Sequence, residues 1–354
     1  MPVLHAPAVS HDAVEFAYED LDALRAVRVR PDLGRRSQPI ELTPASHRRP
    51  RTWRGRLPRP ELDRLEYVFE LVHRNGSTHL VLDPANPLRA RGPFGEKSEV
   101  RWPEYREPAW LAADPPPGDL VELEVRSRAL RAHVPVLVWA RADAEPGEPL
   151  PLLVVHDGPE TAEYTQLLRL LAAADVPPLR AALIAPVARN EIYSACALYA
   201  RALAHELLPA VLASAPTPDE QRMRIGLGAS LGALALLHAH RQHPRLFGAL
   251  FLQSGSFFRR ASDPHEGDFP RFDRISRFVG SVLRGDGASP IPITMTCGRA
   301  EENLGNNRAV AAALAGQGYD VRLHEVRDAH TWTGWRDAFD PHLLDLLRRC
   351  WDPT

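Results

Sequence analysis

The chain has 354 residues, a formal net charge of -2 and a hydrophobic share of 44%. This length exceeds the usual size of one domain, so we expect two domains, each with a core of its own. The balance of apolar and charged residues argues against a disordered chain, and the basic residues are scattered among acids, which argues against a nucleic-acid partner. No stretch approaches the ~20 apolar residues that span a bilayer, so we expect no membrane partner.

The N-terminal residues and the cysteines predict a cytoplasmic protein. The first residues lack the basic stretch and the apolar run of a secretory signal. Cys196, Cys297 and Cys350 are odd in number and lack the spacing of metal ligands, which suits a reducing compartment. We therefore expect a cytoplasmic location and no metal.

Residues 1–114 have the pattern of a small β-sandwich. The runs VEFAY (14–18) and LRAVRVR (24–30) are rich in valine and aromatic residues and predict strands. Residues 66–84 predict a hairpin in which Asn75 and Gly76 supply the positive φ angles of a tight turn. The sequence Pro-Pro-Pro-Gly at 115–118 cannot continue a helix or a central strand, so it predicts a linker.

Residues 119–354 predict an α/β domain. Residues 120–127 and 134–140 alternate like antiparallel strands, and six short apolar runs follow, separated by helix-like segments. The six runs are residues 151–158, 180–186, 224–228, 249–255, 293–298 and 321–326. Helices are expected over residues 193–212, 231–240 and 335–351. This order is typical of a mostly parallel sheet with helices on both faces.

The pentapeptide GASLG (228–232) follows one of the apolar runs and opens a predicted helix. It matches the G-x-S-x-G pattern, in which a serine stands on a strained turn and the flanking glycines let the neighbouring backbone pass. Ser230 is therefore the predicted nucleophile. The N–H of Leu231, at the positive end of the helix, is a predicted oxyanion donor. The alternative is a glycine-rich turn that contains a serine by chance.

A base and an acid are expected after the last two strands. His330 follows the final predicted strand and precedes the final helix, where the order Ser, acid, His requires the base. Glu301 and Glu302 follow the preceding strand, and a carboxylate there would hold the histidine tautomer. We predict Glu301 as the acid, with Glu302 as the second candidate. The alternative is that one or both glutamates only begin the next helix, where negative charge is favoured.

A second oxyanion donor is expected in the HDGPE segment (156–160). Gly158 is the predicted donor, because its backbone can approach a substrate closely and Pro159 has no N–H. A plain turn at Asp157 and Gly158 is compatible with the same residues.

Taken together, these motifs resemble the enterochelin-esterase-like branch of the esterase D family, within the α/β-hydrolases. The resemblance covers nearly the whole chain. Its catalytic part is carried by HDGPE, RNEIYSA (189–195), GASLGALA (228–235), LQSGSFF (252–258), CGRAEEN (297–303) and DAHTWTGWRDAF (328–339). WRGRLP (53–58), LEYVFEL (65–71) and DPANP (83–87) resemble the immunoglobulin-like domain that precedes the catalytic domain of siderophore esterases.

The resemblance implies an immunoglobulin-like β-sandwich followed in sequence by an α/β-hydrolase domain. It also implies Ser230 as nucleophile, His330 as base and Glu301, which matches the family's G-x-x-E, as acid. It implies no cofactor and no metal. Siderophore esterases often show Gly-Gly-His-Asp, where this chain has Asp-Ala-His-Thr at 328–331. The loop around Thr331 and Trp332 is expected to line the substrate pocket.

We therefore expect a carboxylic-ester hydrolase that acts on a small-molecule ester through an acyl-enzyme on Ser230. The candidate substrate-binding residues, each with structural packing as the alternative, are Arg189, Phe257, Phe258 and Trp332. For Arg189, the structural alternative is an ion pair with Glu191 at a helix start. Two other functions remain open, an acyltransferase on the same triad and a non-catalytic carbohydrate-binding protein.

Overall fold

The structure is a computed structural model that describes residues 6–45, 51–145 and 147–351. Contacts divide the chain into two compact units. The first consists of Met1–Glu107 with two later segments, Gly298–Glu302 and Val326–Gly334, and the second of Pro108–Cys297, Asn303–Glu325 and Trp335–Thr354. The expected linker at 115–118 falls inside the second unit in this division. The boundaries 1–114, 115–118 and 119–354 stay a prediction.

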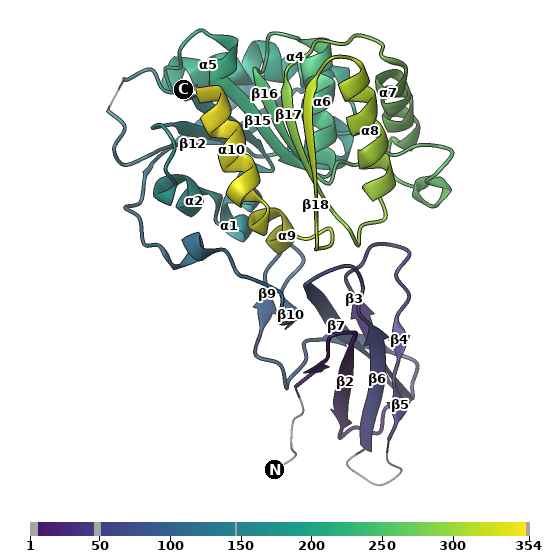
Figure 1. The fold of residues 1–354 in the computed structure, drawn as a ribbon. Coiled ribbons are helices and arrows are strands. Elements are labelled where there is room, and N and C mark those ends of the chain that lie inside the picture. Colours follow the sequence, from purple (N-terminus) through teal and green to yellow (C-terminus); the bar gives the residue numbers. More distant parts are fainter. Residues whose placement is uncertain (1–5, 46–50, 146, 352–354) are drawn as a thin grey trace. The chain divides into compact units, whose positions relative to one another are not determined.

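The first unit contains two antiparallel sheets (Figure 1). One sheet has the order β1-β2-β6-β5, and its strands are β1 (Ala8–Val9), β2 (Ala13–Asp20), β6 (Arg51–Pro58) and β5 (Thr43–Pro44). The other has the order β4-β3-β7-β10-β9, with β8 also paired to β7. Its strands are β4 (Ile40–Glu41), β3 (Ala26–Pro31), β7 (Arg64–Val72), β10 (Lys97–Arg101), β9 (Arg89–Ala90) and β8 (Thr78–Val81).

The two sheets share one core, because alternate residues of their strands point inward. Phe16 of β2 and Tyr67 of β7 belong to different sheets, and their ring centroids lie 4.8 Å apart. Both rings are buried, as is Phe69, whose ring meets that of Tyr67 edge to face at 5.8 Å. The β-rich character expected for this part of the chain is confirmed.

The predicted hairpin is confirmed, but its turn differs from the expectation. Strand β7 pairs with β8, with Val72 opposite Thr78. Gly76 has a φ of 86°, whereas Asn75 is not among the residues with positive φ. Asn75 instead stabilises the turn through its side chain, which accepts a hydrogen bond of 3.0 Å from the N–H of Ser77. The expectation of two residues with positive φ is therefore wrong for Asn75.

The second unit is built on an eight-stranded sheet with the order β11-β12-β14-β13-β15-β16-β17-β18. Its strands are β11 (Asp119–Ser127), β12 (Ala132–Ala140), β13 (Leu152–His156), β14 (Arg180–Ile184), β15 (Arg224–Ala229), β16 (Ala249–Gln253), β17 (Pro292–Gly298) and β18 (Asp320–Val326). Strand β12 is antiparallel to β11 and β14, and the pairs from β14 through β13, β15 and β16 to β17 are parallel. The predicted mostly parallel sheet is confirmed.

Helices connect these strands. The α-helices are α1 (Gly158–Thr165), α2 (Leu167–Ala173), α3 (Arg189–Ile192), α4 (Ala197–Ala202), α5 (Leu208–Ser214), α6 (Leu231–Gln242), α7 (Phe272–Arg284), α8 (Leu304–Gly316), α9 (Trp332–Asp337) and α10 (Phe339–Trp351). Short helices are η1 (Ala109–Ala112), η2 (Leu203–Leu207, a π-helix), η3 (Gln221–Met223) and η4 (Pro264–Glu266). The helix predicted over 335–351 is interrupted: a turn at Ala338 separates α9 from α10, and Asp340, inside α10, has non-helical angles.

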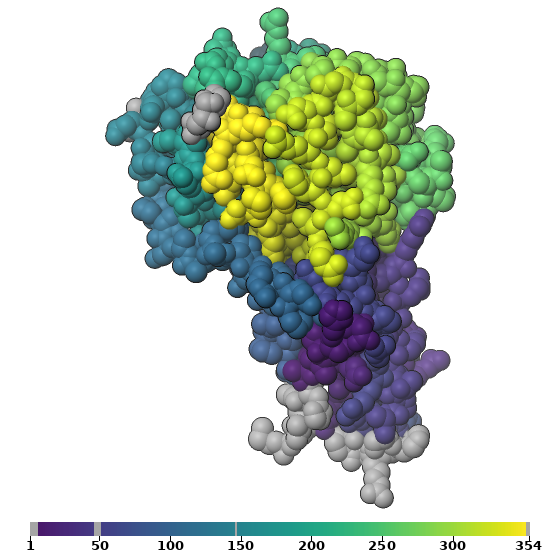
Figure 2. All heavy atoms as spheres, in the orientation of Figure 1, coloured from purple at the N-terminus to yellow at the C-terminus, as the bar shows by residue number. Residues whose placement is uncertain are grey.

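The sheet carries a separate apolar core on each face, as a parallel sheet covered on both sides requires. Leu152 and Val154 of β13 belong to one core, together with residues of α4 to α8. Leu153 and Val155 point the other way and pack with α2 and α10. Figure 1 shows these helices around the strands, and in Figure 2 the other side of α10, which carries the exposed Asp345, is open to solvent.

His156 ends β13 and is fully buried, with 0% of its surface exposed. Its Nδ1 lies 3.1 Å from the carbonyl oxygen of Gly232 and its Nε2 lies 2.8 Å from the hydroxyl of Tyr199, while the Tyr193 ring stacks on it at 4.7 Å. A neutral ring with its proton on Nδ1 satisfies both contacts, since it donates to the carbonyl and accepts from the hydroxyl. Burial lowers the pKa of His156 to about 3.

This burial makes the stability of the protein depend on pH. Below its ordinary pKa of 6.5, His156 binds a proton in the unfolded chain but not in the folded one until about pH 3. The free energy of unfolding therefore falls as the pH drops from about 6.5 towards 3, by up to ~1.4 kcal/mol per pH unit for this one group. His238 and His342, with pKa values lowered to about 4, add to the same trend.

We predict that His156→Gln lowers the melting temperature at pH 7 but weakens its further fall between pH 6.5 and 4. The matched control is His133→Gln, because the His133 side chain is 60% exposed. Thermal unfolding of the wild type and both variants across this pH range measures the slopes. If the melting temperature of His156→Gln falls with pH as steeply as that of the wild type, His156 binds its proton equally in the folded and unfolded chain.

Candidate active site

Ser230 stands on the turn between β15 and α6 with φ 55° and ψ -121°. Such a conformation costs a non-glycine residue ~1–3 kcal/mol and persists only where its surroundings hold it. Here the Ser230 N–H donates to the carbonyl of Gln253 at 2.8 Å, and its own carbonyl accepts the N–H of Ser256 at 3.1 Å. The end of β16 and the loop after it therefore hold the strained serine from both sides.

The glycines on either side of Ser230 lie where the backbone and side chains pack closely. A Cβ on Gly228 would lie 2.7 Å from the carbonyl carbon of Gly232, closer than Cβ atoms approach. A Cβ on Gly232 would lie 3.2 Å from the Cβ of His156. Leu231 is the first residue of α6, so its N–H has no carbonyl partner within the helix. Its role as an oxyanion donor stays a prediction.

A second hydroxyl adjoins Ser230 that the sequence reasoning missed. The Oγ atoms of Ser256 and Ser230 lie 3.0 Å apart. The loop that carries Ser256 is held by asparagines of α8 and its N-cap, because Asn303 donates to the carbonyl of Ser254 at 3.0 Å and Asn307 to that of Gly255 at 3.1 Å. The LQSGSFF motif signalled this loop but not which serine meets Ser230.

Glu301 and His330 lie together in the first unit. Oε2 of Glu301 is 2.7 Å from Nδ1 of His330, and Oε1 accepts the N–H of Gly298 at 2.7 Å. The Glu301 side chain is 2% exposed and that of His330 is 36% exposed. A carboxylate at Nδ1 holds the ring proton there, so Nε2 is the nitrogen that can accept a proton.

The backbones of the two loops that carry this pair are in direct contact. A Cβ on Gly298 would lie 2.3 Å from the carbonyl oxygen of Asp328, so only glycine fits between the loops. That same carbonyl accepts the N–H of Ala300 at 3.3 Å, and the N–H of Arg299 donates to Val326 at 2.8 Å. The positions of Glu301 and His330 are thus fixed by hydrogen bonds between the ends of β17 and β18.

Glu302 has other partners. Its Oε1 accepts the N–H of Arg36 at 2.5 Å, in a loop of the first unit around Gly34. Glu302 is exposed, in contrast to the buried Glu301. Of the two adjacent glutamates, the structure brings Glu301 to His330.

Arg189 pairs with Asp157 and not with Glu191, so the alternative of an Arg189–Glu191 ion pair is wrong. Nε and Nη2 of Arg189 each donate to one carboxylate oxygen of Asp157 at 2.7 Å. Glu191 instead binds Arg271 at 2.6 Å and Arg274 at 2.9 Å. Asp157 follows directly on the buried His156, so the Arg189 guanidinium is anchored at the carboxyl end of β13. Its side chain remains 36% exposed, which leaves room for a ligand.

Gly158 begins α1 and is buried. A Cβ there would lie 2.3 Å from the Cα of Leu183, so glycine is needed where α1 crosses β14. Its role as an oxyanion donor stays a prediction, with a physical reason for the glycine that the sequence reasoning did not name.

The aromatic candidates differ in exposure. Phe257 is 0% exposed and belongs to the core, so its ring offers no surface to a ligand in this structure. Phe258 is partly buried, and its ring meets that of Phe269 at 5.3 Å. Trp332 is half-buried in the first unit, with its Cδ1 3.5 Å from the position of a Cβ on Gly92.

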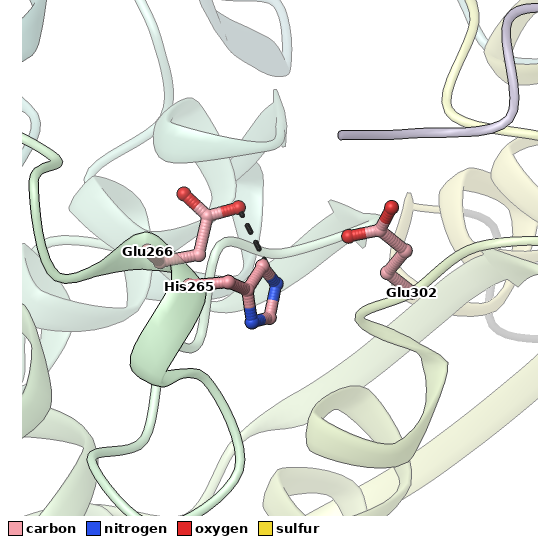
Figure 3. A group of neighbouring side chains, drawn as sticks. All are labelled: His265, Glu266 and Glu302. Carbon is pink, nitrogen blue, oxygen red and sulfur yellow. Dashed lines mark ion pairs between the residues drawn. The ribbon is translucent and has the colours of Figure 1, made fainter. Parts of the chain in front are cut away.

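A histidine and a glutamate that could bind a metal ion adjoin in the second unit. In η4 of the second unit, Nε2 of His265 lies 3.9 Å from Oε1 of Glu266 (Figure 3). Glu302, also drawn in Figure 3, belongs to the first unit. Within either unit, residues 6–45, 51–145 and 147–351 hold no group of three such side chains with their ligand atoms together, whereas catalytic zinc sites have three protein ligands. Over the same residues, no helix has the length and apolar character of a membrane span.

Comparison with known proteins gives consistent matches. The chain is 28% identical over 286 residues to the iron(III) enterobactin esterase of Dickeya dadantii, which covers 75% of this chain and 64% of that protein. It is 27% identical over 304 residues to the iron(III) enterobactin esterase of Escherichia coli O6:H1, covering 83% of this chain and 72% of the relative. The chain thus spans less than two thirds of the Dickeya protein.

The fold is similar to that of solved enterobactin esterases. The crystal structure of the ferric enterobactin esterase of Salmonella typhimurium superimposes with a TM-score of 0.78 at 23% identity, over 96% of this chain and 94% of that one. The expected α/β-hydrolase-like fold is therefore confirmed. The sequence model described as putative esterase matches residues 129–346. The chain belongs to this family of putative esterases, and its resemblance to enterochelin esterases is confirmed.

Proposed function

We propose that the protein is a serine carboxylic-ester hydrolase with Ser230 as nucleophile, His330 as general base and Glu301 as the carboxylate that orients the histidine. The observation that carries the proposal is the 2.7 Å contact between Glu301 Oε2 and His330 Nδ1. The strained turn at Ser230 supports it, because such a turn is costly and is typical of the nucleophile of α/β-hydrolases. The proposal adds that His330 Nε2 comes within hydrogen-bond reach of the Ser230 hydroxyl.

In the proposed reaction the Ser230 Oγ bonds to the ester carbonyl carbon while its proton moves to His330 Nε2. The N–H groups of Leu231 and Gly158 stabilise the oxyanion. The bond to the alcohol oxygen then breaks, and the alcohol leaves with the proton from His330. Water repeats these steps on the acyl-enzyme and releases the acid. Glu301 stays ionised and stabilises the imidazolium.

The substrate class that we propose is supported by the similar proteins and by the candidate substrate-binding side chains that are exposed. Both curated relatives named above are iron(III) enterobactin esterases. We propose an ester of the same siderophore type, bound by Arg189, whose side chain is 36% exposed, and by the rings of Phe258 and Trp332. Phe257 is left out because it is buried in the core. We also propose that the two sheets of the first unit form an immunoglobulin-like sandwich; the cytoplasmic location stays a prediction.

The two other functions have less support. An acyltransferase would differ only in the acceptor of the acyl group, and the curated relatives named above are esterases. A non-catalytic carbohydrate-binding protein would have no use for a buried glutamate that holds a histidine tautomer.

We predict that Ser230→Ala lowers ester turnover by up to ~10⁶-fold, because the nucleophile is lost. The test uses p-nitrophenyl acyl esters, feruloyl esters and a tri-catecholate siderophore with the full chain. Ser256→Ala is the matched comparison, because its hydroxyl lies 3.0 Å from that of Ser230. It should cost about ten-fold at most, the effect of one hydrogen bond. If Ser256→Ala is the inactive variant, the nucleophile is assigned to the wrong serine.

We predict that Glu301→Gln lowers turnover by ~10⁴-fold, the effect of losing a triad carboxylate, with little change in melting temperature. Glu302→Gln is the matched control, since Glu302 adjoins Glu301 but contacts Arg36. It should keep wild-type turnover. The reverse pattern would move the acid to Glu302 and leave the serine and histidine assignments in place.

A further inference from the structure

Arg64 is a buried arginine at the start of β7, with 1% of its surface exposed. It belongs to the first unit, which also contains the segment Val326–Gly334 that carries His330. A guanidinium is always charged and has only donors, so a buried one requires acceptors around it. The identity of those acceptors indicates what this residue does.

The main acceptor is Asp328, two residues before His330. Nε of Arg64 donates to Asp328 Oδ2 at 2.9 Å and Nη2 donates to Asp328 Oδ1 at 3.2 Å, in the bidentate geometry of the strongest ion pairs. Nη2 also donates to the hydroxyl of Thr331. Asp328 and Thr331 are buried, with 6% and 4% exposure. One guanidinium therefore binds residues on both sides of His330.

These acceptors are tied into the rest of the loop. Asp328 Oδ1 accepts the N–H of Ala329 at 2.7 Å, and Thr331 Oγ1 accepts the N–H of Gly334 at 3.1 Å. The Asp328 carbonyl accepts the N–H of Ala300, next to Glu301, at 3.3 Å. The contacts of Arg64 thus extend to both loops that meet in the Glu301–His330 pair.

The neighbouring strands provide only some of the acceptors that the Arg64 guanidinium binds. It also donates to Glu66 at 3.0 Å and to Glu99 at 3.5 Å. These glutamates have other cations on β10, because Lys97 lies 3.7 Å from Glu66 and Arg101 pairs with Glu99. Outside β7 and β10, Arg64 binds the side chains of Asp328 and Thr331.

We propose that Arg64 is a positioning residue for His330. By binding Asp328 and Thr331 it fixes the loop on both sides of the imidazole, so that Nδ1 stays on Glu301. The inference rests on the proposed function insofar as the position of His330 matters for ester hydrolysis. A displacement of ~1 Å in a reacting group lowers rates by ~10²-fold, so a loosened loop reduces turnover without removing any group that touches substrate.

The kinetic test compares Arg64→Met with Arg101→Met, a loss of the same charge at a residue that contacts Glu99 but not the His330 loop. We expect kcat to fall ~10- to 100-fold in Arg64→Met with KM within about three-fold of wild type. Arg101→Met should keep the wild-type kcat. Arg64→Lys should recover part of the loss, since it restores the charge but not the bidentate geometry. Equal kcat in folded Arg64→Met and wild type overturns the proposal.

Asp328→Asn and Thr331→Val test the same contacts if Arg64→Met does not fold. Each should lower kcat more than Arg101→Met does. Where Arg64→Met does fold, its double variant with Asp328→Asn should be no slower than the slower single variant. Wild-type kcat in both Asp328→Asn and Thr331→Val overturns the proposal.

A readout independent of turnover separates the positioning role from the proposed function. In ¹⁵N-histidine-labelled protein, the proton between His330 Nδ1 and Glu301 should give a downfield ¹H signal, identified by its absence in His330→Gln. We expect this signal in the wild type and in Arg101→Met, and its loss or exchange broadening in Asp328→Asn and Arg64→Met. If the wild type hydrolyses no ester in the panel, the proposed function fails, and this signal decides the positioning alone. An unchanged signal in both variants overturns the proposal.

Discussion

The hydrogen bond between Glu301 and His330 is the interaction on which the proposed chemistry depends. A carboxylate that is 2% exposed would be costly to bury without partners, and here one oxygen accepts the Gly298 N–H while the other holds His330 Nδ1. The contact requires the ends of β17 and β18 to lie against each other, which a side chain at position 298 would prevent. The glycine, the acid and the base therefore form one geometric unit.

Close contacts with neighbouring residues also hold the turn at Ser230. The serine keeps its strained backbone because Gln253 and Ser256 bind its N–H and carbonyl. Behind the turn, the neutral His156 binds the carbonyl of Gly232 and so supports the first turn of α6. The start of α6 would stabilise negative charge that develops in the reaction. It is held by His156, which burial keeps uncharged. His156 therefore adds no positive charge to the residues that pack behind Ser230.

Much of the fold was predictable because its patterns are local. Apolar runs of five to eight residues between helix-like segments predicted the parallel sheet, and the glycines at 228 and 232 marked the turn at Ser230. The chain order placed His330 after the last strand, and the G-x-x-E spacing favoured Glu301. These predictions used short motifs and the order of the elements along the chain, and none needed a contact between distant residues.

What the sequence did not predict depends on contacts between distant residues. The contact between Asp157 and Arg189 joins residues 32 positions apart, and no local pattern indicates it. The contact of Arg64 with Asp328 spans 264 positions and has no local signature. Phe257 stands beside Phe258 in one motif, but its ring is buried in the core whereas Phe258 is only partly buried. The positive φ expected at Asn75 failed because its side chain stabilises the turn instead.

The most direct test of the central claim, that Ser230 is activated by His330, is covalent labelling with a fluorophosphonate probe followed by peptide mapping in a mass spectrometer. A serine reacts with this probe when a base removes its proton, so the account predicts one adduct, on Ser230, and much slower labelling in His330→Gln. An adduct on Ser256, or labelling of Ser230 at the same rate without His330, would contradict it.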